Sequence, residues 1–300
     1  MFRLAHLSDV HLGPLPPVRY RELVSKRITG YVNWHRNRSR NLGDDVLSRL
    51  CDDMLAQEPD HIALTGDLVN LALDAEIEAA RLWLQAFAPA GQASVVPGNH
   101  DAYVPGALEK ACHAWSPWMT GDGVNAPVTR KSFPYLRVRG PVALIGVSSA
   151  VATAPFLASG EFSGKQARKL APILEEAGER GLYRVIMIHH PPLRGAASPY
   201  KRLYGIRRFQ KTVLEHGAEL VLHGHTHLPT LGHIRGDGRV IPVAGVPAGG
   251  QGLNGHKPAA GYSLFEIDGG PGAWTTTMRR RALTGQTLGF KDVEHRNLDE

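Results

Sequence analysis

Five short polar runs carry side chains that could bind metal ions, and each follows a short apolar stretch. The apolar stretches cover residues 4–7, 62–64, 94–96, 185–188 and 220–222. The polar runs after them are Asp9-Val10-His11, Gly66-Asp67, Gly98-Asn99-His100-Asp101, His189-His190 and Gly224-His225-Thr226-His227. Apolar stretches of this length are typical of buried strands, and open α/β folds bind ligands at the carboxyl ends of parallel strands. The sequence therefore predicts one site at that edge.

The residue types in these runs indicate the chemistry of the site. Histidine, aspartate and asparagine together suit Mn²⁺, Fe²⁺ or Zn²⁺ better than ions that prefer thiolates alone or oxygen atoms alone. Two such ions held about 3.5–4 Å apart can stabilise both the attacking and the leaving oxygen of an in-line displacement at phosphorus. We therefore expect two divalent metal ions per chain and a phosphate-ester substrate.

The runs resemble those of the calcineurin-like metallophosphoesterases. That family's pattern is Asp-x-His, Gly-Asp, Gly-Asn-His-Asp/Glu, His and Gly-His-x-His, and every part occurs here in the same order, over residues 1 to about 265. The resemblance implies that one metal is held by Asp9, His11 and His227 and the other by Asn99, His189 and His225, with Asp67 bridging the two. It also implies hydrolysis by in-line attack of a metal-bound hydroxide.

The resemblance gives His100 a different role, which is catalytic. In the family this histidine faces the substrate and helps to neutralise or protonate the leaving oxygen, and Asp101 would orient it. General acid catalysis of this kind contributes about 10²–10⁴-fold in rate. Asn70, His190 and Arg194 are expected as substrate contacts at the edge of the site. For Asn70 and His190, a turn or capping role is an equal alternative.

Each run taken alone has a simpler explanation. An aspartate after a strand is commonly a helix N-cap or a turn residue. His6, His61 and His223 lie within or beside the strand runs and are expected to be buried sheet residues. Five runs in the family's order, however, would need five independent coincidences. The joint interpretation as a metal site is therefore favoured.

The pattern between the runs predicts an α/β fold. Helical patterns cover residues 44–57, 74–88, 105–115, 164–177 and 204–216, and further strands are expected at 142–147, 240–243, 262–267 and 274–278. Strands alternating with helices, followed by a strand-rich end, suit two facing sheets flanked by helices. The resemblance implies the four-layer αββα sandwich of the metallophosphoesterase type. We expect a single domain over residues 1–280 and, at 281–300, a polar C-terminal tail or a docked edge strand.

The amino terminus, the cysteines and the apolar runs indicate the compartment. Residues 2–8 already form the first strand and Asp9 is a predicted ligand, so no cleaved signal peptide is expected. No apolar run approaches about 18 residues, which argues against a membrane span. Cys51 and Cys112 make no disulfide framework. We expect a cytoplasmic protein, with peripheral contact at the inner membrane surface as an alternative.

Positive charge is concentrated in two segments. The formal net charge is +6, whereas residues 19–40 hold seven basic side chains against one acid and residues 194–211 hold six without an acid. Both segments follow runs with predicted ligands, so we expect them to flank the mouth of the site and to face an anionic partner. Solvated positive faces without a partner are the simpler alternative.

The first basic segment belongs to an insertion at about residues 15–41, in which apolar and aromatic residues mix with Lys and Arg in a helical pattern. Such a segment can lie in a membrane interface or can pack over the pocket as a lid. The insertion resembles the acyl-chain-handling additions of lipid A-pathway members of the family. Contact with an anionic membrane through residues 19–40 is therefore a candidate partnership.

Three functions are consistent with these features. The first is hydrolysis of a phosphodiester (a cyclic nucleotide, a glycerophosphodiester or similar), since Gly-Asn-His-Asp and the run His189-His190-Pro191-Pro192 resemble the bacterial cyclic-nucleotide phosphodiesterase branch. The second is a membrane-surface pyrophosphohydrolase of a UDP-linked lipid A precursor, favoured by the insertion. The third is a non-catalytic scaffold of the same fold, against which the complete ligand set argues. Nucleic acid is not an expected partner: the pI of about 9.4 would suit it, but no recognised nucleic-acid module is present.

Overall fold

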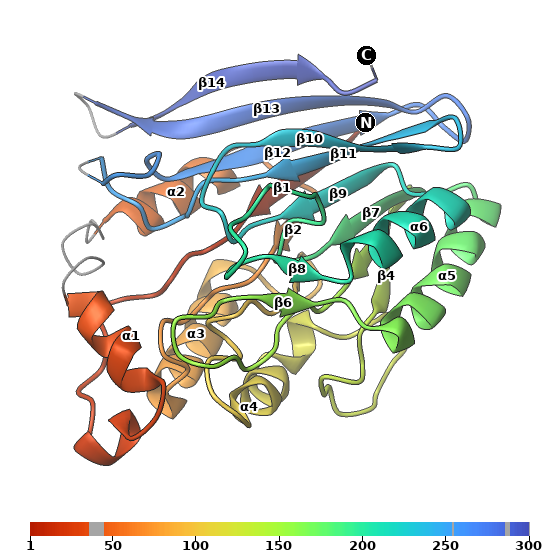
Figure 1. Cartoon of the computed structure of the whole chain (residues 1–300). Helices are drawn as coiled ribbons and strands as arrows, with labels where there is room; N and C mark the ends of the chain where they lie inside the picture. Colours follow the sequence, from red (N-terminus) through yellow and green to blue (C-terminus); the bar gives the residue numbers. More distant parts are fainter. Residues whose placement is uncertain (36–44, 254, 286–288, 300) are drawn as a thin grey trace.

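The computed structural model describes residues 1–35, 45–253, 255–285 and 289–299 of the 300-residue chain. Two six-stranded sheets lie face to face, and helices cover their outer sides (Figure 1). The predicted α/β fold, with two facing sheets flanked by helices, is confirmed. No helix among the described residues is long and apolar enough to cross a membrane.

The first sheet has the strand order β14-β13-β12-β1-β2-β3. Its parallel part consists of β1 (Phe2–Leu7), β2 (His61–Leu64) and β3 (Ala93–Val95). Its antiparallel part consists of β12 (Gly261–Asp268), β13 (Thr275–Thr284) and β14 (Gly289–Asn297). Because β1, β2 and β3 run in the same direction, the residues that follow them meet at one edge.

The second sheet has the order β10-β11-β9-β7-β5-β4. Its strands are β4 (Tyr135–Arg139), β5 (Val142–Gly146), β7 (Tyr183–Met187), β9 (Leu220–His223), β10 (Leu231–Gly236) and β11 (Arg239–Gly245). A small pair, β6 (Gly160–Glu161) and β8 (Leu203–Tyr204), lies outside both sheets. Strands β5, β7, β9 and β11 are parallel to their neighbours in this series, so β7 and β9 also end at a common edge.

The helices pack in the intervals where the sequence pattern predicts them. They are α2 (Val46–Leu55), α3 (Asp74–Phe87), α4 (Ala107–Ala114), α5 (Gly164–Glu179) and α6 (Ile206–His216). A short 3₁₀ helix, η3 (Ser116–Trp118), follows α4. The predicted start of the first of these helices, residue 44, lies outside the described residues.

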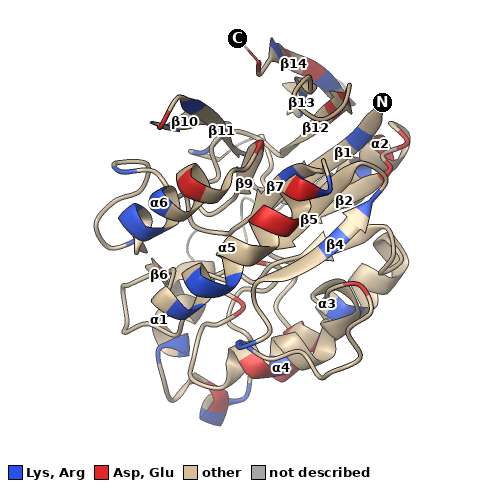
Figure 2. Ribbon diagram, turned by 90° about the vertical axis from the view of Figure 1, so that its right-hand side faces the viewer, with Lys and Arg blue, Asp and Glu red and all other residues tan. Residues whose placement is uncertain are grey.

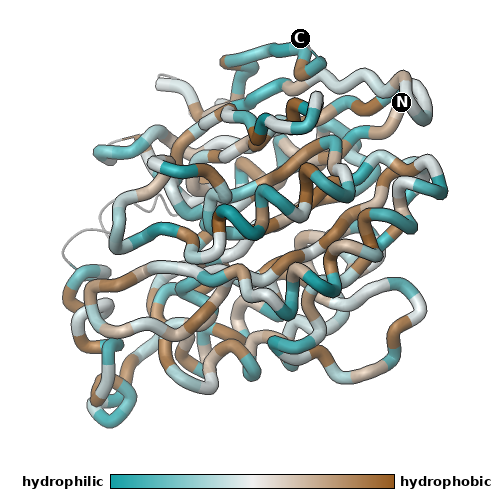
Figure 3. The backbone as a smooth tube through the Cα atoms, turned by 45° about the vertical axis from the view of Figure 1, so that its right-hand side comes forward, coloured by the Kyte–Doolittle hydropathy of each residue, from teal (hydrophilic) through white to brown (hydrophobic). Residues whose placement is uncertain are grey.

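Strand β7 has apolar side chains on both faces of its sheet, and they pack in two different cores. Val185 and Met187 belong to the core that contains the inner faces of both sheets, whereas Ile186 and Ile188 pack with residues of α5 and α6. Side chains of a strand alternate between its two faces, so β7 is apolar on both sides. Figure 3 shows the same distribution, with hydrophobic segments in the strands and hydrophilic turns on the outer helices.

The residues at the carboxyl end of the chain form part of the first sheet. β13 extends to Thr284, and β14 pairs with it in antiparallel register as the edge strand. Of the two alternatives for residues 281–300, the structure has the docked edge strand. The segment is polar because most side chains of β14 are exposed at the sheet edge, not because it lacks structure.

The insertion is described up to residue 35. It contains a 3₁₀ helix, η1 (Tyr20–Leu23), and a short helix, α1 (Arg27–Asn33), which lie together at one corner of the molecule (Figure 1). Arg36, Arg38 and Arg40 of the predicted basic segment lie outside the described residues. Figure 2 shows basic residues both around α1 and along α6.

Candidate metal centre

The predicted ligands meet where the two sheets present the carboxyl ends of their parallel strands. Asp9, Asp67 and Asn99 follow β1, β2 and β3 of the first sheet, and His189 and His225 follow β7 and β9 of the second. Six of the seven predicted metal ligands are buried, and His227 is partly exposed. The site therefore belongs to both sheets, and neither sheet alone could form it.

Most of these residues have an uncommon backbone conformation. Asp9, His11, Asp67, His225 and His227 have φ angles of 52°, 43°, 56°, 67° and 57°. Residues other than glycine rarely adopt this left-handed region, and such strain is found mainly at functional sites. Gly98 allows the close approach that results, because a Cβ there would lie 2.2 Å from Oδ1 of Asp67.

Asp9, His11 and His227 form the first ligand group. Oδ1 of Asp9 lies 3.1 Å from Nε2 of His227 and 3.9 Å from Nε2 of His11. This oxygen is buried and accepts no hydrogen bond within the described part of the chain. A buried carboxylate oxygen without a hydrogen bond is costly, so the pocket formed by these three side chains fits a cation.

Asp67, His189 and His225 form the second group, with Asn99 beside it. Nε2 of His189 lies 3.3 Å from Oδ2 of Asp67 and 3.2 Å from Oδ1 of Asn99. Oδ2 of Asp67 is also 3.8 Å from Nε2 of His11, in the first group. Asp67 thus stands between the two groups, in the position that a bridging ligand would take.

Asp67 and His189 shift each other's pKa because they lie close together in a buried site. Burial alone would raise the pKa of the Asp67 carboxyl, but the positive charges available on His189, His100 and His11 hold it well below its usual value. Burial lowers the pKa of His189, yet the Asp67 carboxylate outweighs it and raises that pKa to about 9. For Asp9, His227 likewise overcomes the effect of burial and lowers the pKa of the carboxyl.

Backbone carbonyl groups fix which nitrogen of each histidine faces the site. Nδ1 of His11 donates to the carbonyl of Val69 at 3.0 Å, and Nδ1 of His189 donates to that of Thr65 at 2.6 Å. A carbonyl only accepts, so Nδ1 carries a proton, and Nε2 is the nitrogen that could offer a lone pair to a metal. In His225 the order is reversed, because Nε2 donates to the carbonyl of Lys201 at 2.9 Å and leaves Nδ1 as the ligand atom.

His100 lies beside both groups. A possible ligand atom of His100 lies within 4.8 Å of ligand atoms of His11 and Asp67. Its backbone N–H donates to Oδ1 of Asp67 at 2.7 Å, and its Nδ1 donates to the carbonyl of Asn70 at 2.5 Å. The ring of Tyr103 is stacked on it at 5.3 Å. Since Nδ1 is committed to a carbonyl, Nε2 is the atom on which His100 can hold or accept a proton.

Asp101 differs from the expectation that it orients the His100 ring directly. Its carboxylate accepts hydrogen bonds from the backbone N–H groups of Asp67 at 2.9 Å, Leu68 at 2.9 Å and Gly98 at 2.7 Å. The carbonyl of Asn70 is the partner that the structure gives to Nδ1 of His100. Asp101 therefore ties together the two loops that carry Asp67 and His100.

The three expected substrate contacts lie in different surroundings. Asn70 lines a cavity beside His100 and donates from its side chain to the carbonyl of Leu12. His190 is buried, and both ring nitrogens are engaged, by Ser149 Oγ at 2.8 Å and the carbonyl of Ala158 at 3.1 Å, which favours a structural role. Arg194 is exposed and lines neither of the cavities at the centre. As expected, His6, His61 and His223 are buried in or beside the strands.

Two cavities open at the centre. A small one of about 110 Å³ is lined by ligand residues together with Lys201 and Lys257, and a second of about 310 Å³ lies beyond His100. Lys26, from the basic segment that was expected to flank the mouth of the site, lines the second cavity; Tyr103 and Phe156 also line it and were not predicted, because nothing in the sequence connects them with the ligand runs. Burial lowers the pKa of Lys26 to about 8, although the charge of Asp67 opposes this.

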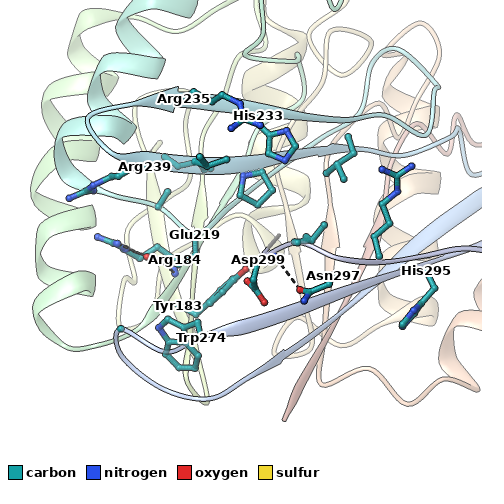
Figure 4. Close-up of a pocket in the computed structure, with 18 residues that line it drawn as sticks. Tyr183, Arg184, Glu219, His233, Arg235, Arg239, Trp274, His295, Asn297 and Asp299 are labelled. Carbon is teal, nitrogen blue, oxygen red and sulfur yellow. Dashed lines mark hydrogen bonds and ion pairs between the residues drawn. The ribbon is translucent and has the colours of Figure 1, made fainter.

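A larger cavity, of about 940 Å³, lies elsewhere in the described part of the chain (Figure 4). Tyr183 and Arg184 at the start of β7 line it, as do Glu219 before β9 and Arg239 at the start of β11. These are the amino ends of the strands whose carboxyl ends lead to the metal centre. The cavity therefore lies at the opposite edge of the sheet and is separate from the candidate site.

Glu76 supports the loop that holds His100. It is buried on α3, and its carboxylate accepts backbone N–H groups of Asn70 at 2.8 Å, Leu71 at 3.0 Å and Leu73 at 3.0 Å. We expect Glu76→Ala to lower the free energy of unfolding by about 3 kcal/mol, because three buried donors lose their acceptor. Urea denaturation measures this.

The same variant should also turn over more slowly while its metal content stays normal, because the Asn70 carbonyl would no longer be held against His100. Glu78→Ala on the same helix is the matched control, since Glu78 is exposed and pairs only with Arg81 among the described residues. Equal stability of the Glu76 and Glu78 variants would contradict the assigned role.

Known proteins resemble the chain in both sequence and fold. A sequence model of the calcineurin-like phosphoesterase family matches residues 2–229. The crystal structure of a dimetal phosphatase from Danio rerio has a TM-score of 0.61 at 12% identity and covers 97% of this chain and 98% of that chain. A search of curated protein sequences gave no match.

Two further structures resemble the chain. A purple acid phosphatase from yellow lupin (Lupinus luteus) seeds has a TM-score of 0.55 at 12% identity and covers 97% of this chain and 53% of that chain. A 5'-nucleotidase precursor from Thermus thermophilus has a TM-score of 0.50 at 13% identity and covers 92% of this chain and 53% of that chain. At these identities the likeness concerns the fold.

Proposed function

The chain belongs to the calcineurin-like phosphoesterase family, and from this we propose that it hydrolyses a phosphodiester, such as a cyclic nucleotide or a glycerophosphodiester. The family consists of dinuclear metal-dependent hydrolases of phosphate esters. One observation carries the proposal: Asp67 lies between two groups of ligand-type side chains, and His100 lies beside both groups and lines a cavity of about 310 Å³. Metal ligands, a proton carrier and room for an organic group are the parts that such a hydrolysis needs.

The chain's own groups fit two divalent ions. Asp9, His11 and His227 would hold one, Asn99, His189 and His225 the other, and Asp67 would bridge them. When bound, such ions polarise a phosphoryl oxygen and supply an activated nucleophile. Imidazole, carboxylate and amide donors favour Mn²⁺, Fe²⁺ or Zn²⁺.

His100 would supply the proton for the leaving group. The Asn70 carbonyl fixes Nδ1–H, so a protonated His100 presents Nε2–H as its transferable donor. An alkoxide leaving from a diester is a strong base and gains much from protonation. Tyr103, stacked on the ring, keeps it from turning away from the cavity.

The two cavities suggest how a diester would lie. The phosphoryl group fits the small cavity among the ligands, and one organic substituent enters the larger one beside Lys26 and Asn70. The second substituent would leave past Lys257 at the rim of the small cavity. A volume of about 310 Å³ is at the lower end of ligand pockets, so the enclosed substituent is compact.

Pyrophosphate hydrolysis on a UDP-linked lipid is the second candidate function. A further cavity of about 620 Å³ begins at His11 and is lined mainly by apolar side chains, among them Trp34, Leu47, Trp83 and Phe87. Such a cavity could receive an acyl chain next to the metal centre. Its contact with Trp34 ties it to the insertion.

A panel of substrates distinguishes these candidates. The Mn²⁺-loaded protein is assayed with bis-p-nitrophenyl phosphate, p-nitrophenyl phosphate, cyclic AMP, a glycerophosphodiester and UDP-diacylglucosamine. We expect at least one diester to be cleaved with a kcat/KM at least tenfold above the monoester, and a chelator to abolish turnover until Mn²⁺ is restored. Preference for the monoester overturns the proposal. Preference for UDP-diacylglucosamine selects the second function, and no turnover on any substrate selects a scaffold.

A further inference from the structure

Helix α1 has one face that is tightly attached to the rest of the protein. Arg27 donates to the carbonyls of Leu71 at 2.9 Å and Ala72 at 2.5 Å. A Cβ on Gly30 would lie 2.3 Å from the hydroxyl of Tyr103, which shows how closely the helix packs there. Trp34, one turn further, is buried. Positions 27, 30 and 34 lie on the same side of a helix, and this side faces the catalytic loops.

The opposite face is apolar as well, although it faces solvent. Ile28 and Val32, one turn apart on α1, are 53% and 42% exposed. Val24 and Tyr20, just before the helix, are 77% and 87% exposed. A helix on the surface of a water-soluble protein normally carries polar residues here, and contiguous exposed apolar side chains indicate an interaction surface.

Two neighbouring loops add aromatic residues beside the same helix. Lys26 of the insertion donates to the carbonyl of Leu157 at 2.7 Å, which joins it to the loop that carries Phe156, and Ala158 donates to the carbonyl of Tyr200 at 2.9 Å. Phe156 is 85% exposed and Tyr200 is 67% exposed. Phe156 also has a φ of 65°, which is strained for a bulky residue. We call Tyr20, Val24, Ile28 and Val32 the insertion face; Phe156 lies on the loop that meets the helix on its cavity side.

Basic side chains accompany the insertion face. Arg19 and Arg21 are exposed next to Tyr20, and Arg202 is exposed next to the loop of Tyr200. Lys26 and Arg27 do not contribute, because Lys26 donates to Thr153 and Leu157 and Arg27 donates to the carbonyl of Leu71. Exposed aliphatic and aromatic side chains mixed with arginine are the combination that binds the interface of an anionic membrane.

We propose that the insertion face binds the surface of a lipid bilayer with anionic headgroups. Tyr20, Val24, Ile28 and Val32 would enter the boundary between headgroups and acyl chains, and Arg19 and Arg21 would contact the phosphates. The same helix lines the cavity beside His100 through Lys26 and Gly30, so binding places the mouth of the active site at the membrane. This inference does not depend on the proposed substrate, since vesicle binding is measured without turnover.

Flotation with vesicles tests the proposal on the full chain. Vesicles of phosphatidylglycerol and phosphatidylcholine are compared with vesicles of phosphatidylcholine alone. We expect the wild-type protein to float with the anionic vesicles at low salt and to dissociate from them at high salt. The triple variant Val24→Ser, Ile28→Ser, Val32→Ser should bind at least tenfold more weakly. Arg19→Gln with Arg21→Gln should weaken binding roughly thirtyfold if both side chains lie at the surface.

The control removes equally exposed apolar side chains elsewhere. Leu82 on α3 is 53% exposed and Val293 on β14 is 56% exposed, so Leu82→Ser with Val293→Ser changes similar surface outside the insertion face. This variant should bind vesicles as the wild type does. Hydrolysis of a soluble diester should be unchanged in the triple serine variant, because none of its three positions lines a cavity of the centre.

Three outcomes overturn the proposal. One is wild-type protein that does not float with anionic vesicles at low salt. Another is equal loss of binding in the triple variant and in the control. The third is a wild-type oligomer that the triple variant converts to monomer on size-exclusion chromatography, which would assign the face to a second copy of the chain. If the wild-type protein binds anionic vesicles but does not hydrolyse a soluble diester, the proposed function is wrong and the membrane proposal is unaffected.

Discussion

Asp67→Asn is expected to bind less than two equivalents of metal and to lose roughly 10³-fold or more in kcat/KM, about 4 kcal/mol of transition-state stabilisation. The carboxylate lies within 3.8 Å of Nε2 of His11 and 3.3 Å of Nε2 of His189, one in each ligand group. Replacing it by a neutral amide removes the negative charge placed between the two ions. Metal analysis and steady-state kinetics measure the two effects.

Asn tolerates the left-handed backbone of Asp67, with its φ of 56°, so the substitution should not distort the loop. Asp237→Asn is a matched control, because Asp237 has a φ of 51° but is exposed on a turn outside the metal centre. The control should keep full metal content and activity. Two retained equivalents with near-normal turnover in Asp67→Asn would contradict the bridging assignment, whereas loss of His227 should weaken mainly one metal.

The sequence predicted where the candidate metal ligands would meet because the ends of strands can be recognised from the sequence alone. An apolar run that stops at Asp9, Asp67 or His189 marks both the strand and the edge where the polar residue lies. Parallel pairing then brings the runs together, as β1 with β2 and β7 with β9 show. The helices between the strands were predicted for the same reason, since their periodicity is local.

Features that depend on contacts between distant segments were not predictable. Strands β4 and β10 lie at sheet edges and carry too many polar residues to give an apolar run. The partner of His100 Nδ1 is a backbone carbonyl, which any residue at position 70 would provide. The expectation that Asp101 orients His100 rested on family resemblance, and its carboxylate here accepts from backbone donors of the Asp67 loop.

The roles of the basic residues in the insertion could not be predicted from the sequence either. In the sequence, residues 19–40 form one basic segment, yet Lys26 and Arg27 turn inward and bind the carbonyls of Leu157 and Leu71. Only folding separates cations that anchor a segment from those that face a partner. The same distinction applies to the apolar residues of α1, where Trp34 is buried and Ile28 is exposed although both fit one helical pattern.

His100→Ala is expected to keep both metals but to slow the cleavage of diesters with poor leaving groups by about 10²–10⁴-fold. The ligand group of Asp9 and that of His225 are each complete without His100. Nε2 is the ring atom that can transfer a proton, since Nδ1 donates to the Asn70 carbonyl. p-Nitrophenolate leaves without protonation, so bis-p-nitrophenyl phosphate should be affected much less than an alkyl diester.

The comparison between the two leaving groups is what separates an acid from a ligand. Loss of a ligand slows every substrate and lowers the metal content, whereas loss of an acid slows only the substrates that need a proton. His113→Ala, at an exposed position on α4, controls for removal of an imidazole as such and should leave both rates unchanged. If His100→Ala slows the aryl and alkyl diesters equally, or loses metal, then His100 acts as a ligand or as a binding group, and the proton must come from another residue.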